Sequence, residues 1–177
     1  MSVLRKSDRQ SPKRFGPFAP WIAAVIFLSL FFIAIFNLLY ESKVEVDHLV
    51  STHIQQLEAI FQKIDQKCKI LSFSQDKNYI DFLTVKEFSG SQVGPIMLMF
   101  PEKWEGPYIK DNPAIQEKLY QVIKTYKGYF IVPGDGVKLA SLKVIGKDIV
   151  FDSNSDIESM IVAGGVLNSE NRPLAAK

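Results

Sequence analysis

The sequence predicts an α+β protein in which a single N-terminal transmembrane helix continues as an amphipathic helix, packed on a small antiparallel β-meander. Three observations predict this fold. An uncharged run covers 15–40, apolar residues recur at helical spacing over 50–71, and short β-branched and aromatic runs alternate with turn residues over 119–149. The expected organisation is a basic cytoplasmic leader at 1–14, a transmembrane helix at 15–40, an amphipathic stalk helix at 41–71, an extracytoplasmic α+β domain at 72–167 and a flexible tail at 168–177.

Composition and charge narrow the class of protein. Of the 177 residues, 47% are hydrophobic and 23% are charged, which excludes a disordered chain. The single cysteine, Cys68, has no partner within the chain for a disulfide. The net charge of +2 is the sum of +4 before residue 15 and −2 over the rest of the chain. Because the rest of the chain is not basic, we expect no nucleic-acid partner. The charged residues of the leader are Arg5, Lys6, Arg9, Lys13 and Arg14, with the acidic Asp8.

The uncharged run has the length of a membrane span. About twenty helical residues at ~1.5 Å each reach ~30 Å, the thickness of the hydrocarbon core, and Trp21 and Tyr40 flank the densest part as interfacial aromatics do. A cleaved signal peptide is the main alternative, and a buried core helix is a lesser one. The run exceeds the usual ~7–15 apolar residues of a signal peptide, and no A-x-A-like cleavage site follows Asn37. We therefore expect an uncleaved signal anchor.

The flanking charges predict the orientation of this anchor. Basic residues before a first membrane segment stay in the cytoplasm, whereas the residues that follow Tyr40 are of mixed sign. We therefore expect a single-pass protein of the cytoplasmic (inner) membrane, in contact with membrane lipid. Its N-terminus would lie in the cytoplasm and residues 41–177 would be extracytoplasmic.

The segment after Tyr40 carries one apolar stripe. No glycine interrupts it before Gly90, and Gln, Glu, Lys and Asp fill most of the opposite face. Ile60 widens the stripe beyond a two-in-seven coiled-coil seam, which favours packing on the chain's own domain over packing on a partner helix, although both remain open. The candidate interaction residues are Val50, Ile54, Leu57, Phe61 and Ile64, and the stripe continues through Cys68 and Leu71.

Cysteine and histidine on this helix are the residues most able to carry chemistry. Cys68 lies on the stripe, which favours a small buried hydrophobe over a reactive thiol. His48 and His53 are five residues apart, not the four that would place two metal ligands on one helical face. We expect both histidines to be solvated.

The distal domain is expected to consist of short strands and turns. The strongest pattern is a hairpin, in which Tyr120–Tyr126 and Tyr129–Pro133 flank a turn at Lys127–Gly128. A helix follows, with Ser155 as its N-cap and Glu158 three residues later, as in a capping box. The other expected elements are a strand or edge segment at 78–85, a loop with a short strand at 92–101, a helical turn at 113–118, meander strands at 137–140 and 143–145, and a helix stop at 164–165.

Asp152, Asn154 and Asp156 form a candidate metal site. They place oxygen side chains at alternate positions, as the start of a calcium-binding loop does. An EF-hand is excluded because Ile157 and Ala163 stand where that motif needs glycine and glutamate. An irregular calcium site remains an alternative, but hydrogen-bond acceptors at a helix N-terminus explain these residues more simply. We expect no other cofactor.

Two aromatic residues form the remaining candidate surface. Trp104 and Tyr108 flank turn residues, a composition typical of interaction surfaces, although core positions explain them equally well. Catalytic patterns are missing from the sequence: no nucleophile elbow, H-E-x-x-H, P-loop or dinucleotide-binding glycine pattern occurs. We therefore expect no enzymatic activity.

Several segments are similar to a known family. Ile33–Leu39 reads I-A-I-F-N-L-L, similar to the I-A-I-P-N-L-L of pilin helices, and Lys13–Phe15 resembles their leader junction. Trp104–Tyr108 and Gly128–Pro133 are similar to a loop and a strand of pseudopilins. With its order of leader, long helix and small sheet, the chain resembles the type IV pilin and type II secretion pseudopilin family. It differs from the family's pattern in lacking the cleavage-site glycine and the glutamate that follows it.

This resemblance implies a structural, non-enzymatic component of an envelope secretion or pilus-like system. Such a component would contact other envelope membrane proteins through its transmembrane and stalk helix. Two other hypotheses remain. One is a bitopic scaffold of a cell-envelope or division complex that uses the stalk as a coiled coil, and the other is an extracytoplasmic enzyme or calcium-dependent binder.

Overall fold

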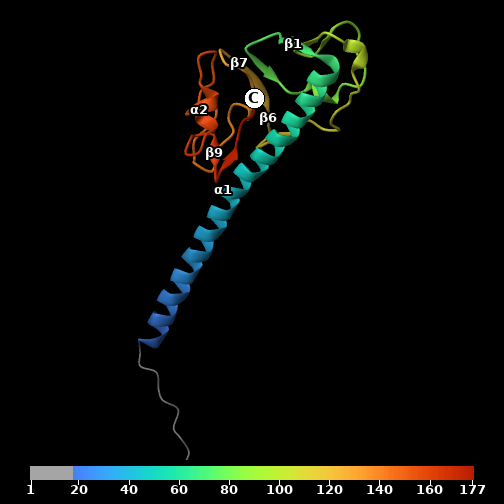
Figure 1. The fold of residues 1–177 in the computed structure, drawn as a ribbon. Coiled ribbons are helices and arrows are strands. Elements are labelled where there is room, and N and C mark those ends of the chain that lie inside the picture. Colours follow the sequence, from blue (N-terminus) through green and yellow to red (C-terminus); the bar gives the residue numbers. More distant parts are fainter. Residues whose placement is uncertain (1–17) are drawn as a thin grey trace, which may run out of the picture. The chain divides into compact units, whose positions relative to one another are not determined.

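The computed structural model describes residues 18–177 and separates the chain into two compact units, Met1–Tyr40 and Glu41–Lys177. The expected basic leader at 1–14 and the junction at 13–15 lie outside the described residues. The fold is α+β, with an N-terminal apolar helix and a helix packed on small antiparallel sheets, as the sequence predicts (Figure 1). Helix α1 covers Ala19–Cys68.

The first unit contains an apolar helix. From Pro20 to Leu39, α1 is long and apolar enough to cross a membrane, and none of the side chains in this window is buried. Pro20 lies in the first helical turn, where its missing N–H breaks no intrahelical bond. The segment is therefore consistent with a signal anchor or a signal sequence.

In the second unit, the apolar stripe of α1 packs on the sheets of the same chain. Phe61, half-buried, meets Phe82 edge to face, with ring centroids 5.9 Å apart. The stripe therefore serves the chain's own core, as the sequence favours, and these positions do not form an exposed coiled-coil seam. The stripe residues with at most 1% of their surface exposed are Val50, Ile54, Leu57, Ile64 and Cys68.

Helix α1 ends at Cys68, three residues before the expected end at Leu71. Lys69 adopts a left-handed conformation with φ 56°, which terminates the helix. The Asp65 carboxylate then accepts a hydrogen bond of 3.0 Å from the Ile70 N–H. Leu71 belongs to strand β1 (Ile70–Phe73). Its position in sequence continues the helical spacing of the apolar stripe, but it is not part of the helix.

The first sheet has three antiparallel strands in the order β1–β4–β3. Strands β3 (Gln92–Val93) and β4 (Ile96–Leu98) form a hairpin, where the sequence predicts a loop with one short strand. Ile70 pairs with Leu98 and Phe73 with Ile96, with an irregularity in register between them. The short helix η2 (Pro101–Lys103) follows.

The second sheet has the order β2–β7–β8. Strands β7 (Gln121–Thr125) and β8 (Gly128–Val132) form the expected hairpin, with Thr125 paired to Gly128. The third strand is β2 (Lys77–Tyr79), which pairs with β7. The 78–85 segment therefore begins as a strand and continues as the short helix η1 (Phe82–Thr84).

The expected meander strands at 137–140 and 143–145 are wrong. The backbone there forms tight turns with single bridges, Lys138 to Val144 and Ile145 to Ile149. Asp47 of α1 accepts a hydrogen bond of 3.0 Å from the Ala140 N–H. This contact joins residues far apart in sequence, so the local pattern gave no sign of it.

The expected helical turn at 113–118 is a two-stranded hairpin of β5 (Ala114–Ile115) and β6 (Lys118–Leu119). Its two turn residues, Gln116 and Glu117, have φ 50° and 63°, as the favoured two-residue hairpin turn requires. Neither residue is a glycine or asparagine, so the sequence carried no turn signal.

The last helix and the tail both differ from expectation. Helix α2 (Ile157–Ile161) is capped by Asp156, whose carboxylate accepts from the Ser159 N–H, and not by Ser155. It ends at Ile161, before the glycines at 164–165. Where a loose tail is expected at 168–177, the structure has strands β9 (Asn168–Ser169) and β10 (Arg172–Pro173), followed by buried residues from Leu174 to Ala176.

Candidate functional site

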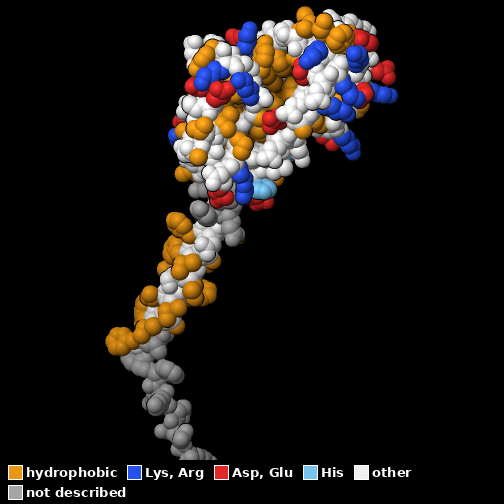
Figure 2. Space-filling view, in the orientation of Figure 1, with side chains coloured by type: hydrophobic (Ala, Val, Ile, Leu, Met, Phe, Trp, Pro, Cys, Tyr) orange, Lys and Arg blue, Asp and Glu red, His pale blue; other side chains and the backbone are white. Residues whose placement is uncertain are grey.

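The apolar part of α1 is the first candidate functional surface. Large side chains from Trp21 to Leu39 are exposed on all sides, and Figure 2 shows them as a hydrophobic surface along the helix. The hydroxyl of Ser29 donates a hydrogen bond of 2.8 Å to the Ile26 carbonyl, so its proton is paired within the helix. An exposed apolar surface of this extent is unfavourable in water.

The candidate metal residues are engaged with the chain itself. Asp152 accepts from the Asn154 N–H at 2.9 Å and from the Ser155 hydroxyl at 2.8 Å, and both bonds hold its pKa below the ordinary value. Asp156 caps α2 and also accepts from Lys127. Within 18–177, no group of three or more His, Cys, Asp and Glu is placed to hold a metal ion.

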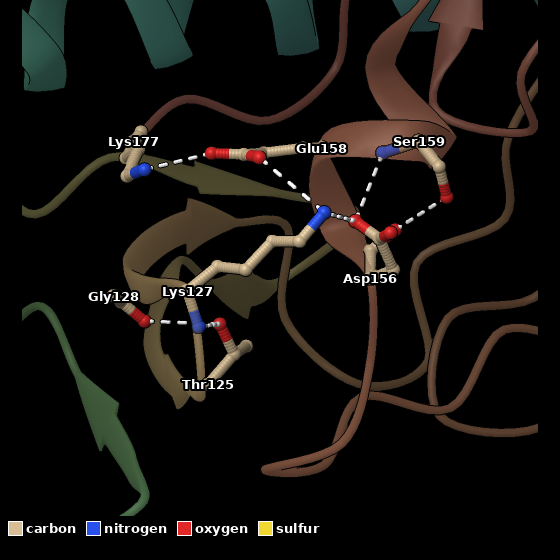
Figure 3. A network of polar contacts seen from close by, with 7 residues as sticks. All are labelled: Thr125, Lys127, Gly128, Asp156, Glu158, Ser159 and Lys177. Carbon is tan, nitrogen blue, oxygen red and sulfur yellow. Dashed lines mark hydrogen bonds and ion pairs between the residues drawn. The ribbon is translucent and has the colours of Figure 1, made fainter.

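A network of charges joins the hairpin turn, α2 and the tail (Figure 3). Lys127 Nζ lies 2.7 Å from Asp156 Oδ1 and 3.5 Å from Glu158 Oε2, and Lys177 Nζ lies 2.7 Å from Glu158 Oε1. The hydrogen bond between Lys127 and Asp156 raises the pKa of Lys127 and lowers the pKa of Asp156. Because the side chains are partly exposed, this network positions the tail more than it stabilises the fold.

Trp104 and Tyr108 are half-buried core residues and not an exposed interaction patch. The Trp104 indole donates a hydrogen bond of 3.1 Å to the Val85 carbonyl, and its ring meets Tyr108 edge to face at 4.8 Å. Glu105, between them, pairs with Lys67 of α1 at 2.5 Å and with Lys63 at 3.7 Å. The bond from Lys67 lowers the pKa of Glu105. The loop is thus fixed to α1.

The cysteine is buried, as expected, whereas one histidine is partly buried and not fully solvated. Cys68 is fully buried, and desolvation raises the pKa of its thiol. His53 is half-buried against Tyr120, whereas His48 is exposed, as expected. Sequence reasoning missed the His53 contact because Tyr120 is distant along the chain.

A hollow of about 340 Å³ lies in the second unit, between α1 and the two three-stranded sheets. Its floor is largely aromatic and aliphatic, and its rim is polar. Figure 2 shows hydrophobic side chains at the bottom of a recess in this unit. The sequence gave no sign of it, because its lining comes from α1, β1, β7, β8 and Lys177 of the tail. The lining residues are Glu58, Phe61, Gln62, Asp65, Gln66, Ile70, Phe73, Val122, Tyr129, Ile131 and Lys177.

Comparison with known proteins gives no family. No family model, no curated protein and no solved structure matches the chain.

Proposed function

We propose that this chain is a membrane-anchored, non-enzymatic structural component of an envelope secretion or pilus-like assembly, similar to the type II secretion pseudopilins. The observation that carries the proposal is the contrast within α1. Residues 20–39 expose apolar side chains on all sides, whereas residues 50–68 bury one stripe in the chain's own core. A helix with these two surfaces suits an anchor at one end and a folded domain at the other.

The location follows from the same segment. An uncleaved anchor with a basic leader would place the N-terminus in the cytoplasm and residues 41–177 outside the inner membrane. Exposed apolar side chains from Pro20 to Leu39 would contact lipid and the membrane helices of other envelope proteins. The burial of the stripe argues against a scaffold that uses the stalk as a coiled coil.

The anchor is tested by fractionating cells that express the full chain. We expect the protein to resist extraction by alkaline carbonate and to keep its full mass, with residues 41–177 open to protease added outside the inner membrane. Release into the soluble fraction with a mass loss corresponding to cleavage near residue 40 would overturn the anchor in favour of a signal sequence.

The assembly role is tested separately by cysteine crosslinking in the membrane. Phe27→Cys and Phe36→Cys place thiols on the exposed apolar surface, while the native Cys68 is buried and serves as an internal control. We expect a benzophenone–maleimide probe attached to these thiols to give crosslinks to neighbouring membrane proteins on irradiation. A protein that stays uncrosslinked at both positions contradicts an assembly role while leaving the anchor intact.

A further inference from the structure

An exposed leucine lies at the tip of a tight turn in the second unit. The Leu139 N–H donates to the Lys143 carbonyl and the Leu142 N–H to the Leu139 carbonyl, each over 2.9 Å, which closes the 139–143 turn. Leu142 has φ 66°, a left-handed conformation that glycine usually supplies in three-residue turns of this kind. It is the one apolar side chain among the described non-glycine residues with positive φ, and it is 52% exposed. Packing within the chain therefore does not explain a leucine at this position.

The length of the chain limits how far this turn can lie from the apolar window of α1. Asp47 of α1 accepts a hydrogen bond of 3.0 Å from the Ala140 N–H, so the turn contacts α1 at that residue. Asp47 follows Leu39, the last residue of the apolar window, by eight residues. Eight residues span about 12 Å as a helix and about 28 Å when fully extended. With residues 20–39 in the membrane, the turn is therefore held close to the lipid headgroups.

The turn and the residues beside it carry free positive charges. The stretch 138–147 contains no acidic residue, and its lysines form no ion pair with any described residue. The acids on either side of the stretch are engaged, because Asp135 pairs with Lys77 at 3.6 Å and Asp148 accepts from the Val144 N–H at 2.8 Å. The lysines are therefore available to anions outside the chain. These exposed lysines are Lys138, Lys143 and Lys147.

Charge alone does not define this surface. Glu45 of α1 is exposed. Glu117 is exposed beside Gln116, whose side-chain amide bonds both backbone groups of Lys138 at 2.9 Å. These acids weaken the attraction of the lysines for anions, so the apolar contact of Leu142 is needed as well. An apolar side chain flanked by lysines is typical of segments that bind at a lipid–water interface.

We propose that the 139–143 turn docks on an anionic lipid surface next to the membrane span. Leu142 enters the interfacial layer, and the three lysines of the 138–147 stretch meet lipid phosphates. The partner is lipid because the span tethers the turn at the membrane, where anionic headgroups have a high local concentration. This inference deepens the anchor proposed above and rests on it.

The test uses the full chain reconstituted in vesicles that contain a lipid with a spin-label quencher near its headgroup. A fluorescent dye is attached at Ser141→Cys in the turn or at Ser91→Cys, both exposed positions, while the buried Cys68 stays unlabelled. The Ser91 carbonyl accepts from Leu98 of β4, which pairs with β1 beyond the end of α1. That end lies about 30 Å along the helix from Asp47, so the Ser91 dye serves as the distant control.

The lipid composition of the vesicles separates docking from simple nearness to the membrane. In vesicles of equal parts phosphatidylglycerol and phosphatidylcholine, we expect strong quenching of the Ser141→Cys dye and little quenching of the Ser91→Cys dye. In phosphatidylcholine alone, quenching of the Ser141→Cys dye should be weaker, because the lysines lose their anionic partners. High ionic strength should weaken it in the mixed vesicles in the same way.

Two variants of the Ser141→Cys chain test which side chains dock. Leu142→Asn removes the apolar side chain and introduces a residue that tolerates the left-handed conformation, so the turn is kept. It should lower the ratio of docked to undocked turn at least tenfold, because the burial of a leucine is lost. Lys143→Gln should lower this ratio about fivefold. The matched controls Leu71→Asn and Lys110→Gln, at exposed positions outside the turn, should leave it unchanged.

Three results would overturn the docking and leave the anchor intact. The first is quenching of the Ser141→Cys dye that equals that of the Ser91→Cys dye or does not depend on phosphatidylglycerol. The second is quenching that Leu142→Asn leaves unchanged. The third is a change in dye emission that rises with the protein-to-lipid ratio, which would make a second copy of this chain the partner. Extraction of the full chain from the vesicles by alkaline carbonate would instead overturn the anchor itself, and the docking with it.

Discussion

The Nδ1 atom of His53 and the hydroxyl oxygen of Tyr120 lie 3.0 Å apart, and the two rings meet edge to face. His53 comes from the stripe-bearing part of α1, and Tyr120 immediately precedes β7. Burial raises the pKa of the Tyr120 phenol, so it stays protonated at physiological pH. Desolvation lowers the pKa of His53, so the folded chain favours the neutral imidazole. This contact therefore links helix packing to pH.

We expect the free energy of unfolding to fall as the pH drops below about 6.5. The folded-state pKa of His53 lies below the unfolded value of about 6.5, so the unfolded chain binds more protons in this range. The stabilisation is complete above the unfolded pKa and is lost as the pH falls toward the folded one. Urea unfolding between pH 7.5 and 5.5 measures it.

A histidine pair supplies the control. His53→Gln is expected to flatten the pH dependence in this window, whereas His48→Gln, at an exposed position of the same helix, should leave it unchanged. An unchanged slope in His53→Gln would contradict the assignment.

Shortening a stripe residue should destabilise the chain strongly. Ile54 is fully buried, so Ile54→Ala removes core contacts and leaves a cavity, at a cost of about 2–5 kcal/mol. Gln55→Ala, at the neighbouring exposed position, should stay within about 0.5 kcal/mol. Chemical denaturation of the two variants measures both. If the cost of Ile54→Ala depended on protein concentration, the stripe would be an intermolecular seam instead.

The ion pairs of Glu105 with Lys67 and Lys63, which clamp the 101–108 loop to α1, should weaken at acid pH and at high ionic strength. Glu105→Gln removes the ion pairs with Lys67 and Lys63 and is expected to speed hydrogen exchange in the 101–108 loop at pH 7. Because the lowered pKa belongs to the folded state, the stabilisation is present above the ordinary pKa and is lost as the pH falls through the folded one. Glu102→Gln, an exposed acid of the same loop with no such pair, is the matched control. Equal exchange rates in the two variants would argue against the clamp.

Alanine substitutions at two glycines with positive φ distinguish the cost of backbone strain from the cost of a side-chain collision. Gly94 has φ +54°, and a Cβ there would collide with the Phe82 side chain, whereas Gly90 has φ +89° and open space around it. Both alanine variants should lose about 1–2 kcal/mol from the left-handed conformation. Gly94→Ala should lose about 1–3 kcal/mol more, because buried Phe82 must shift. Thermal unfolding of the two variants measures the difference, and equal losses would show that Phe82 yields freely.

Local pattern was enough to predict the long helix, its buried stripe and the β7–β8 hairpin. Their signals, which are helical spacing and a glycine turn between β-rich runs, lie within one short window. The pairing of β2 with β7 joins segments more than forty residues apart, so no local rule predicts it. The β5–β6 turn was missed because Gln116 and Glu117 adopt left-handed conformations that their residue types disfavour.

The candidate site was less predictable than the fold. Tail residues such as Ala175 look loose by composition, yet they are buried because Ala176 pairs with Ile131. Trp104 and Tyr108 resembled surface aromatics because the acceptor of the indole, Val85, precedes Trp104 by nineteen residues. The hollow forms where four elements and the tail meet, and nothing within any one of them marks it.

The burial of Cys68 turns the only thiol of the chain into a built-in probe of motion. An alkylating reagent added to the folded protein reaches that sulfur only when the end of α1 moves away from the residues packed around it. The rate of labelling in native buffer, compared with the rate in denaturant, therefore measures how often the end of α1 opens locally, without any engineered label.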